Sequence, residues 1–446
     1  MNEAEHFESL YPKDSRFDEI EKILSFIREG NSCQIVSVAG VGRSNLLGLL
    51  AYNRNVRIGH LGTQQTSFHF VLLNFSEIRK RPILDATKFL FLGLLDSLRE
   101  RGMKKDYEIV NKYFKESIRF NDEMVLFDGL KKTIDYLAVE NKLTVVFLFD
   151  RFEEYIPMLT PQFFTNLRIL RNRAKYHFSV VFSLNRPLED EIESSLFSDF
   201  FEFVAGRTIY LPILDKPGLD FRISYLEKIT EKKINKDTLE RVLKLTSGHG
   251  RITILCLETL LSLDTKLPEN DSQLLDYFFS QRPIRSSLFA IWNALSPSEQ
   301  EIIKNKKGED IFLEKIGLFK NGEIQIPIFK EFIKTQVVTS EKFNNINSLE
   351  IIYDENANEI KKGENVISEL LTSSEFRLLK FLILNKDKIL EKEEIINSVW
   401  GEQKTTLGVT DQALDQLVFR LRKKIEENPN QPKHIQTIKG RGFKFE

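Results

Sequence analysis

The sequence predicts a multidomain protein, with an α/β domain on a parallel sheet followed by two smaller domains that combine helices with a β-hairpin. Three observations support this fold class. Short buried apolar runs alternate with amphipathic helical patterns through the N-terminal half. A strand, a glycine-containing loop and a helix follow one another between residues 32 and 53. Near the C-terminus, three helical patterns precede two short strands that flank a glycine-rich tip.

Composition and charge bear on the cellular compartment and on the partners that the protein could bind. The 446 residues carry a net charge of −1, so any affinity for nucleic acid must come from local basic surfaces. Between Thr405 and the C-terminus, eight Lys or Arg oppose five Asp or Glu. Cys33 and Cys256 are isolated in apolar contexts, which favours a reducing compartment over a disulfide framework. No signal peptide or membrane-spanning apolar run is evident, and we expect a cytoplasmic protein without a membrane partner.

The helix expected from about Thr410 has the most informative phasing in the chain. Its apolar side would consist of Leu414, Leu417, Val418, Leu421 and Ile425. The opposite side would carry Gln412, Gln416, Phe419, Arg420 and Lys423, with Arg422 at its edge. Glutamine and arginine suit the reading of base edges, and lysine suits the neutralisation of phosphate. The strands "HIQTI" and "FKF" then flank "KGRG", which places Lys439 and Arg441 at the tip of a basic wing.

The segments "LTSSEFRLLKFL", "RLRKKIEENP" and "IQTIKGRGFKF", together with Trp400, resemble the winged-helix effector domain of OmpR/PhoB-type response regulators. The resemblance covers about the last hundred residues, including a small N-terminal β-sheet begun by "LEIIYDENANEI". It implies binding to double-stranded DNA, two protomers head to tail on direct repeats, and RNA polymerase contacts from residues 401–408. On the family's pattern the DNA contacts come from Gln412, Arg420, Arg422, Thr437 and Lys439.

This chain departs from the family at Leu417 and Phe419, so the target sequence cannot be transferred. An exposed Phe419 would suit contact with a thymine methyl group. The alternative interpretation is a winged helix that binds protein, with a basic face that is merely solvated.

Residues 37–44, "SVAGVGRS", form an imperfect phosphate-binding loop. Ser37 replaces the first glycine of the standard pattern, and Arg43 replaces the lysine. Gly40 and Gly42 would still let backbone N–H groups approach phosphate, with Asn45 beside them. Ser44 keeps the hydroxyl that would bind Mg²⁺. We therefore expect ATP or ADP with Mg²⁺ as the ligand, and at most slow hydrolysis, because an arginine fork does not reproduce a lysine ammonium.

Later segments extend this interpretation. Five apolar residues lead into Asp150 and resemble the strand that places a carboxylate beside Mg²⁺ in P-loop NTPases. The resemblance makes Asp150 a candidate Mg²⁺ ligand and catalytic carboxylate, although Arg151 follows where an activating glutamate is common in those proteins. A buried strand ends in Ser183 and Asn185, and "GHGR" brings Arg251 into a helical region.

In this order the segments resemble AAA+/STAND ATPases of the origin-recognition-like branch, across roughly residues 10–265. The resemblance implies that Asn185 senses the terminal phosphate and that Arg251 reaches nucleotide from a lid. Arg251 could equally pair with a lid carboxylate. A decayed nucleotide site on the same fold is the alternative interpretation.

We predict four domains: a P-loop NTPase-like core (1–212), a helical lid (213–265), a linker with a first winged helix (266–340) and the OmpR/PhoB-type winged helix (345–446). The first winged helix, with a hairpin turn at Asn321–Gly322, should pack on the lid because its charges are balanced. Residues 1–15 are polar and should be loosely held.

The leading hypothesis is a sequence-specific transcriptional regulator whose DNA binding or oligomerisation is governed by a STAND-like nucleotide module. A replication-initiator-like ATPase is one rival. A second is a signal-sensing scaffold, in stress or phage response, whose winged helices bind proteins. A constitutive DNA binder with an inert N-terminal domain is the third.

Overall fold

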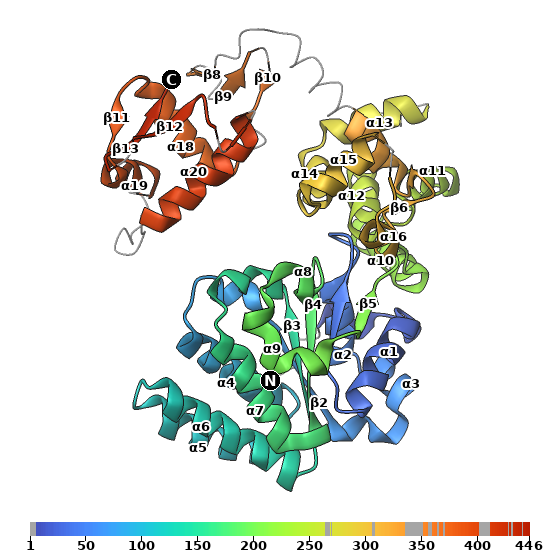
Figure 1. Ribbon diagram of the computed structural model, residues 1–446. Helices are drawn as coiled ribbons and strands as arrows, with labels where there is room; N and C mark the ends of the chain where they lie inside the picture. The colour runs from blue at the N-terminus through green and yellow to red at the C-terminus, as the bar shows by residue number, and fades with distance from the viewer. Residues whose placement is uncertain are drawn as a thin grey trace. The chain divides into compact units, whose positions relative to one another are not determined.

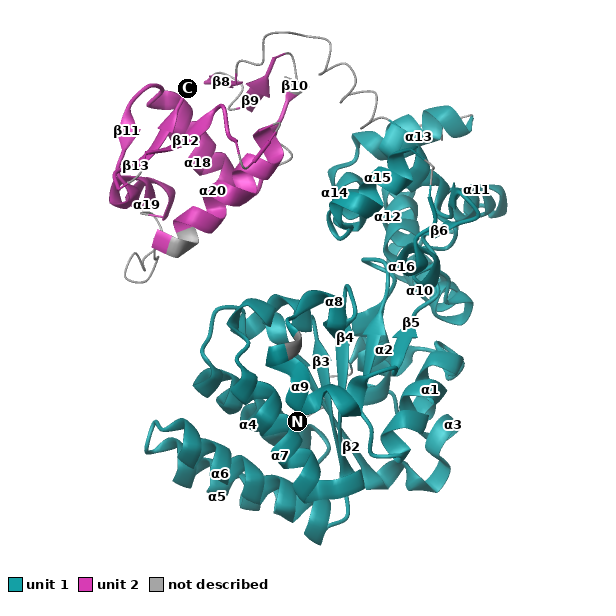
Figure 2. Ribbon diagram, viewed as in Figure 1, with its two compact units in different colours: residues 1–337 teal, residues 338–446 magenta. Residues whose placement is uncertain are grey.

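The computed structural model describes residues 6–263, 268, 270–305, 308–334, 351–355, 359–363, 365–368, 371–400, 411–426, 428–429, 431–438 and 440–446. The chain divides into two compact units, residues 1–337 and 338–446 (Figure 2).

One parallel sheet organises the first unit. Its strand order is β2-β3-β4-β1-β5. The strands are β1 (Cys33–Val36), β2 (Phe68–Asn74), β3 (Thr144–Asp150), β4 (Phe178–Leu184) and β5 (Thr208–Tyr210). Because all five run the same way, their carboxyl ends meet at one edge, so the loops after β1, β3 and β4 lie together there. This edge positions the candidate site.

Side-chain alternation along the strands divides the interior into two cores. On β3, Val146 and Leu148 belong to one core, and Val145, Phe147 and Phe149 to the other. Both faces of the sheet are covered by helices, which explains why the strands are almost continuously apolar (Figure 1). The first core takes α1 (Phe17–Arg28), α2 (Arg43–Tyr52) and α3 (Arg54–Leu61). The second takes α4 (Ile83–Glu100), α5 (Lys104–Ile118), α6 (Glu123–Ile134), α7 (Pro161–Ala174) and α9 (Ser194–Val204).

The N-terminal lead is packed, so the expectation that residues 1–15 are loosely held is wrong for residues 6–15. Tyr11 is only 5% exposed, and its ring centroid lies 4.6 Å from that of Phe221. The buried Asn53 amide donates to the carbonyls of Glu8, at 2.9 Å, and Tyr11, at 3.0 Å. This polar N-terminal segment is ordered because the buried Asn53 amide donates hydrogen bonds to its backbone carbonyls, and because its aromatic side chains pack into the core.

Helices α10 (Lys216–Thr230), α11 (Lys236–Thr246) and α12 (Gly250–Leu261) follow the sheet and agree with the predicted lid segments. Next come α13 (Asp271–Ser280), α14 (Arg282–Asn293), α15 (Pro297–Asn305), α16 (Ile311–Lys315) and the hairpin β6 (Phe319–Lys320) and β7 (Glu323–Ile324). The predicted turn is confirmed, with positive φ at both Asn321 (52°) and Gly322 (76°). Packing of this small domain on the lid is also confirmed, since Ser247 donates to the Gln325 carbonyl at 2.6 Å and both regions share one core.

The second unit has its own core. A small antiparallel sheet contains β8 (Ile351–Asp354), β9 (Glu359–Lys362) and β10 (Asn365–Val366). Three helices follow: α18 (Ser373–Leu384), α19 (Lys392–Trp400) and α20 (Asp411–Ile425). The wing consists of β12 (Ile435–Ile438) and β13 (Gly442–Phe445), and β13 also pairs with β11 (Ile389–Leu390), a strand that the sequence did not reveal. The five residues predicted for the apolar side of α20 are all 0–1% exposed, which confirms its phase.

Candidate functional site

The loop after β1 presents the start of a helix at the carboxyl edge of the sheet. Gly42 (φ 116°) immediately precedes Arg43, the first residue of α2. The first N–H groups of a helix have no intrahelical partners, so they favour an anion at this position. The loop therefore has a backbone suited to phosphate, although Ser37 replaces a glycine of the standard pattern.

Gly40 allows the lid to approach this loop closely. Its φ is 85°, and a Cβ there would lie 3.0 Å from Cε1 of His249 and 3.2 Å from Cβ of Arg251. The Arg251 N–H donates to the Gly40 carbonyl at 3.2 Å. Gly40 is thus required by both its backbone conformation and the close packing of the start of α12.

A neutral imidazole fixes the lid to the loop. His249 Nδ1 accepts from the Ile252 N–H at 3.3 Å, which leaves Nε2 to donate to the Ala39 carbonyl at 2.9 Å. Complete burial lowers the pKa of His249 to about 4, an effect that Arg251 and Arg222 reinforce. The Arg251 side chain is exposed and lies against Gly40, and its predicted contact with nucleotide stays a prediction.

The structure brings together the two residues predicted to bind Mg²⁺. Ser44 Oγ donates to Oδ1 of Asp150 at 3.0 Å, and Ser183 Oγ lies 3.3 Å from the same oxygen. Asp150 is 7% exposed. Within the described part of the chain, no cluster of three or more His, Cys, Asp or Glu could hold a metal by itself. A hydroxyl and a carboxylate fit Mg²⁺ that keeps phosphate oxygens and water among its ligands.

Arg43 contacts residues at the ends of two strands. Its Nη2 donates to Oδ1 of Asn185 at 2.7 Å and to Oε1 of Glu153 at 3.1 Å. The side chains of Arg43 and Glu153 are 13% and 17% exposed. Burial raises the pKa of Glu153, while the nearby guanidinium acts in the opposite direction. Sequence reasoning proposed Arg43 and Asn185 separately but did not find Glu153 as the partner of Arg43.

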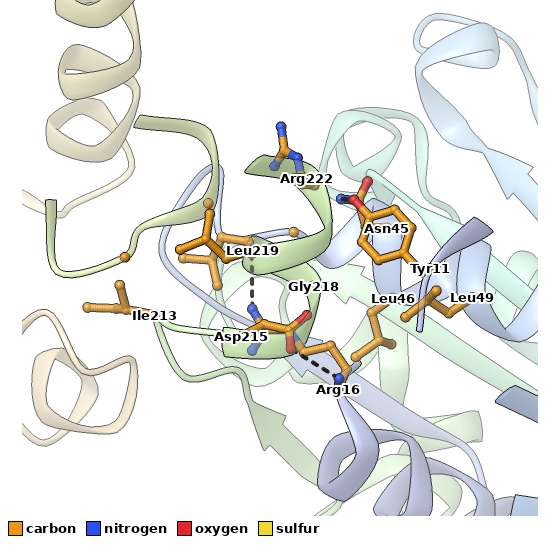
Figure 3. A pocket seen from close by; sticks show the side chains of 14 residues that line it. Tyr11, Arg16, Asn45, Leu46, Leu49, Ile213, Asp215, Gly218, Leu219 and Arg222 are labelled. Atoms are coloured by element: carbon orange, nitrogen blue, oxygen red, sulfur yellow. Dashed lines mark hydrogen bonds and ion pairs between the residues drawn. The ribbon is translucent and has the colours of Figure 1, made fainter. Parts of the chain in front are cut away.

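A narrow cavity of about 30 Å³ lies next to the loop, between the N-terminal segment and the lid (Figure 3). It is lined by Tyr11, Arg16, Val41, Gly42, Asn45, Leu46, Leu49, Ile213, Asp215, Gly218, Leu219, Arg222, Gly248 and Gly250. The amide of Asn45 donates to the Tyr11 hydroxyl at 3.0 Å. Arg16 Nη2 donates to the Val41 carbonyl at 3.0 Å. Tyr11 and Arg16 were missed because they come from a segment without a motif.

In the second unit, α20 has an exposed face of mixed character. Gln416, Phe419, Arg420 and Lys423 are all exposed, and Phe419 remains 46% exposed. The ammonium of Lys423 lies 4.7 Å from the centre of the Phe419 ring. The side chain of Gln412 and the whole of Lys439 lie outside the described residues. The remaining exposed residues have the positions that sequence phasing predicted.

Arg422 has a different environment from Arg420. Its Nε and Nη2 donate to the Ile435 carbonyl at 3.0 and 2.6 Å, and Nη2 also donates to Thr437 Oγ1 at 2.8 Å. The guanidinium therefore joins α20 to the first strand of the wing. At the wing tip Arg441 is exposed. A Cβ at Gly442 would lie 2.0 Å from the Leu390 carbonyl oxygen, so glycine is required where β13 meets β11.

A comparison with known protein families identifies the domain that contains α20 and the wing. Residues 368–445 match the family described as transcriptional regulatory protein, C terminal. Residues 368–445 form an OmpR/PhoB-type winged-helix domain. In this OmpR/PhoB-type domain, α20 has the position of the recognition helix, and β12 and β13 form the wing.

Two curated relatives resemble parts of the chain. The KDP operon transcriptional regulatory protein KdpE of Escherichia coli is 27% identical over 186 residues, which are 42% of this chain and 78% of KdpE. The sensory transduction protein RegX3 of Mycolicibacterium smegmatis is 42% identical over 76 residues, which are 17% of this chain and 32% of RegX3. The second alignment has the length expected of the OmpR/PhoB-type domain alone.

The first unit has a five-stranded parallel sheet with a glycine-containing loop between β1 and α2, which is the arrangement of a P-loop NTPase core. The Walker-type ATPase PABY2304 of Pyrococcus abyssi is a similar solved structure, at 11% identity and a TM-score of 0.40, over 80% of this chain and 95% of that one. Helices long and apolar enough to span a membrane are absent from the described residues.

Proposed function

We propose that this protein is a cytoplasmic, sequence-specific DNA-binding transcriptional regulator whose DNA binding or oligomerisation depends on nucleotide in the first unit. The observation that carries the proposal is the exposed face of α20 in an OmpR/PhoB-type domain. Arg420 and Gln416 would read base edges, and Lys423 would neutralise phosphate. Arg422 would act indirectly by holding the wing in position.

The nucleotide part of the proposal rests on the loop before α2 and on Asp150. Ser44 and Asp150 would hold Mg²⁺ together with phosphate oxygens, and the ion would neutralise phosphate charge. Hydrolysis would be slow at most, because Glu153 already pairs with Arg43 and is not free to polarise water. Asp150 would act through the metal rather than as a base.

Nucleotide would govern the protein through the lid and the first winged helix. A ligand shifts a conformational equilibrium only by its difference in affinity for the two arrangements. Gly40 touches the start of α12, so a phosphate in the loop would bias how the lid packs. The proposal extends to pairs of protomers on direct repeats and to contact with RNA polymerase through residues 401–408, which lie outside the described residues.

The decisive experiment uses the full chain. Thermal stability is measured with and without Mg-ATP or Mg-ADP, and affinity for genomic DNA fragments is measured by fluorescence anisotropy. Ser44→Ala combined with Asp150→Ala should abolish the nucleotide-dependent thermal shift and any nucleotide effect on DNA affinity. Ser280→Ala combined with Asp220→Ala, two exposed positions of the same unit, is the matched control and should retain both effects.

Each part of the proposal can fail separately. Absence of a thermal shift in the wild type would remove the nucleotide control and leave a constitutive DNA binder. Absence of DNA binding at low ionic strength would favour the alternative of a scaffold whose winged helices bind protein.

A further inference from the structure

The contacts of Arg43 bear on which nucleotide the first unit prefers. In a standard P-loop the lysine at this position reaches the β- and γ-phosphates. Here the guanidinium points instead to carboxyl and amide oxygens of Glu153 and Asn185, at 3.1 and 2.7 Å. These residues follow the carboxyl ends of β3 and β4. The side chain at the position that would reach a terminal phosphate is therefore already paired with a carboxylate.

We infer that the Glu153 carboxylate makes this site selective for nucleoside diphosphates over nucleoside triphosphates. The inference deepens the proposed function and rests on it. A diphosphate would place its last phosphate on the N–H groups at the start of α2 and leave the contact between Arg43 and Glu153 in place.

A triphosphate has two ways to bind, and both are unfavourable. In the first, its γ-phosphate lies beside Glu153 while the pair with Arg43 persists, and like charges then repel in a poorly solvated region. In the second, Arg43 turns to the γ-phosphate and Glu153 stays buried without its cation. An uncompensated buried charge is strongly destabilising. Neither cost applies to a diphosphate.

Two unsatisfied atoms support this view of the site. Among the described residues, Nη1 of Arg43 and Oε2 of Glu153 are buried without a hydrogen-bond partner. A guanidinium N–H without a partner suits a phosphate oxygen, whereas a carboxylate oxygen has only lone pairs to offer and repels one. Burial also raises the pKa of Glu153, which indicates that its negative charge is poorly solvated.

The test compares Mg-ADP and Mg-ATP binding to the full chain by isothermal titration calorimetry at pH 8. The wild type should bind ADP at least about tenfold more tightly than ATP, because even a modest repulsion near a protein surface exceeds the 1.4 kcal/mol that corresponds to tenfold. Glu153→Gln keeps an oxygen for Arg43 but removes the charge, so the two affinities should converge. Glu154→Gln is the control, because Glu154 pairs with Arg79 and Arg151 and not with Arg43. Its preference for ADP should equal that of the wild type.

The outcomes separate the two proposals. Equal ADP and ATP affinities in the wild type would overturn the inference while nucleotide binding stands. An unchanged preference for ADP in Glu153→Gln would overturn the assignment to Glu153. Binding of neither nucleotide would refute nucleotide control itself, and the inference with it. The ratio of ADP affinity to ATP affinity is measured on the wild type. It therefore tests the inference even if a substituted protein folds poorly.

Discussion

Arg186 binds Glu299 across more than a hundred residues of sequence, and so joins the sheet of the first unit to the small domain that contains α15. Nη1 of Arg186 lies 3.0 Å from Oε1 of Glu299, and its Nη2 contacts Oε2. Glu299, on α15, is 4% exposed and also accepts from the Ser296 N–H at 2.8 Å. Asn185, the residue before Arg186, accepts from Arg43. Two adjacent residues just after β4 thus contact Arg43, at the start of α2, and Glu299, on α15.

Glu299→Gln should weaken this junction. The amide keeps an oxygen for Ser296 but loses the charge, and a hydrogen bond to a charged group contributes about 1.5–3 kcal/mol. We expect a loss of unfolding free energy in that range. In a Trp400→Phe background Trp292 is the one remaining tryptophan, so its fluorescence during urea unfolding reports on the first unit. Glu301→Gln, exposed on the same helix, is the control and should change stability little.

Arg420→Ala and Arg422→Ala should have different effects. Arg420 is exposed, so its loss should weaken specific DNA binding by about 1–3 kcal/mol while stability stays within about 0.5 kcal/mol. Arg422 holds Ile435 and Thr437, so its loss should lower the stability of the second unit by about 1–3 kcal/mol. Anisotropy with an operator selected from genomic fragments measures the first effect. Urea unfolding followed by Trp400 in a Trp292→Phe background measures the second. A stable Arg422→Ala protein that has lost specificity would contradict this division.

Lys423→Ala should change how DNA affinity depends on salt. An exposed lysine that neutralises one phosphate contributes about −0.9 to the slope of log K against log salt concentration. We expect the slope to become less steep by about one, with a similar loss of affinity for all DNA sequences. Lys228→Ala, an exposed position on α10, should leave the slope unchanged. A slope that is identical in both variants would exclude Lys423 from the phosphate contacts.

His249 should make the first unit less stable in acid. Its pKa is about 4 in the folded protein and near 6.5 when unfolded. Above pH 6.5 neither state binds the proton. Between 6.5 and 4 only the unfolded state binds it, so stability falls as pH falls, and below 4 this contribution levels off. The shift corresponds to about 3 kcal/mol.

The measurement compares the wild type with His249→Gln, because His69 is buried and its pKa is shifted in the same direction. Loss of the contacts with Ala39 and Ile252 makes the variant less stable at pH 7. The wild-type advantage should shrink by about 3 kcal/mol between pH 7 and pH 4. The difference in unfolding free energy is measured by urea unfolding at several pH values, with both proteins in the Trp400→Phe background so that Trp292 reports on the first unit. A constant difference would mean that His249 is not held neutral by the fold.

Local patterns in the sequence were sufficient to predict most of the helices and strands. The spacing of Leu414, Leu417 and Leu421 fixed the buried side of α20, because a helix repeats its faces regardless of what covers them. The pair Asn321–Gly322 determined a hairpin because both residues tolerate positive φ. By contrast β11, two residues long, carries no periodic pattern and exists because it pairs with β13.

The sequence by itself determined most of the strands and helices, the glycine loop and the residue types available at each site. Only the tertiary structure decided how the charges pair: Arg43 with Glu153, Arg186 with Glu299, and Arg422 with the wing rather than with solvent. It also decided that Tyr11 and Arg16 line a cavity beside the loop. The physical reason is that an element forms from neighbouring residues, whereas a long charged side chain takes whichever partner packing brings within reach. Arg43 and Glu153 are 110 residues apart, and only the shared edge of the sheet makes them neighbours.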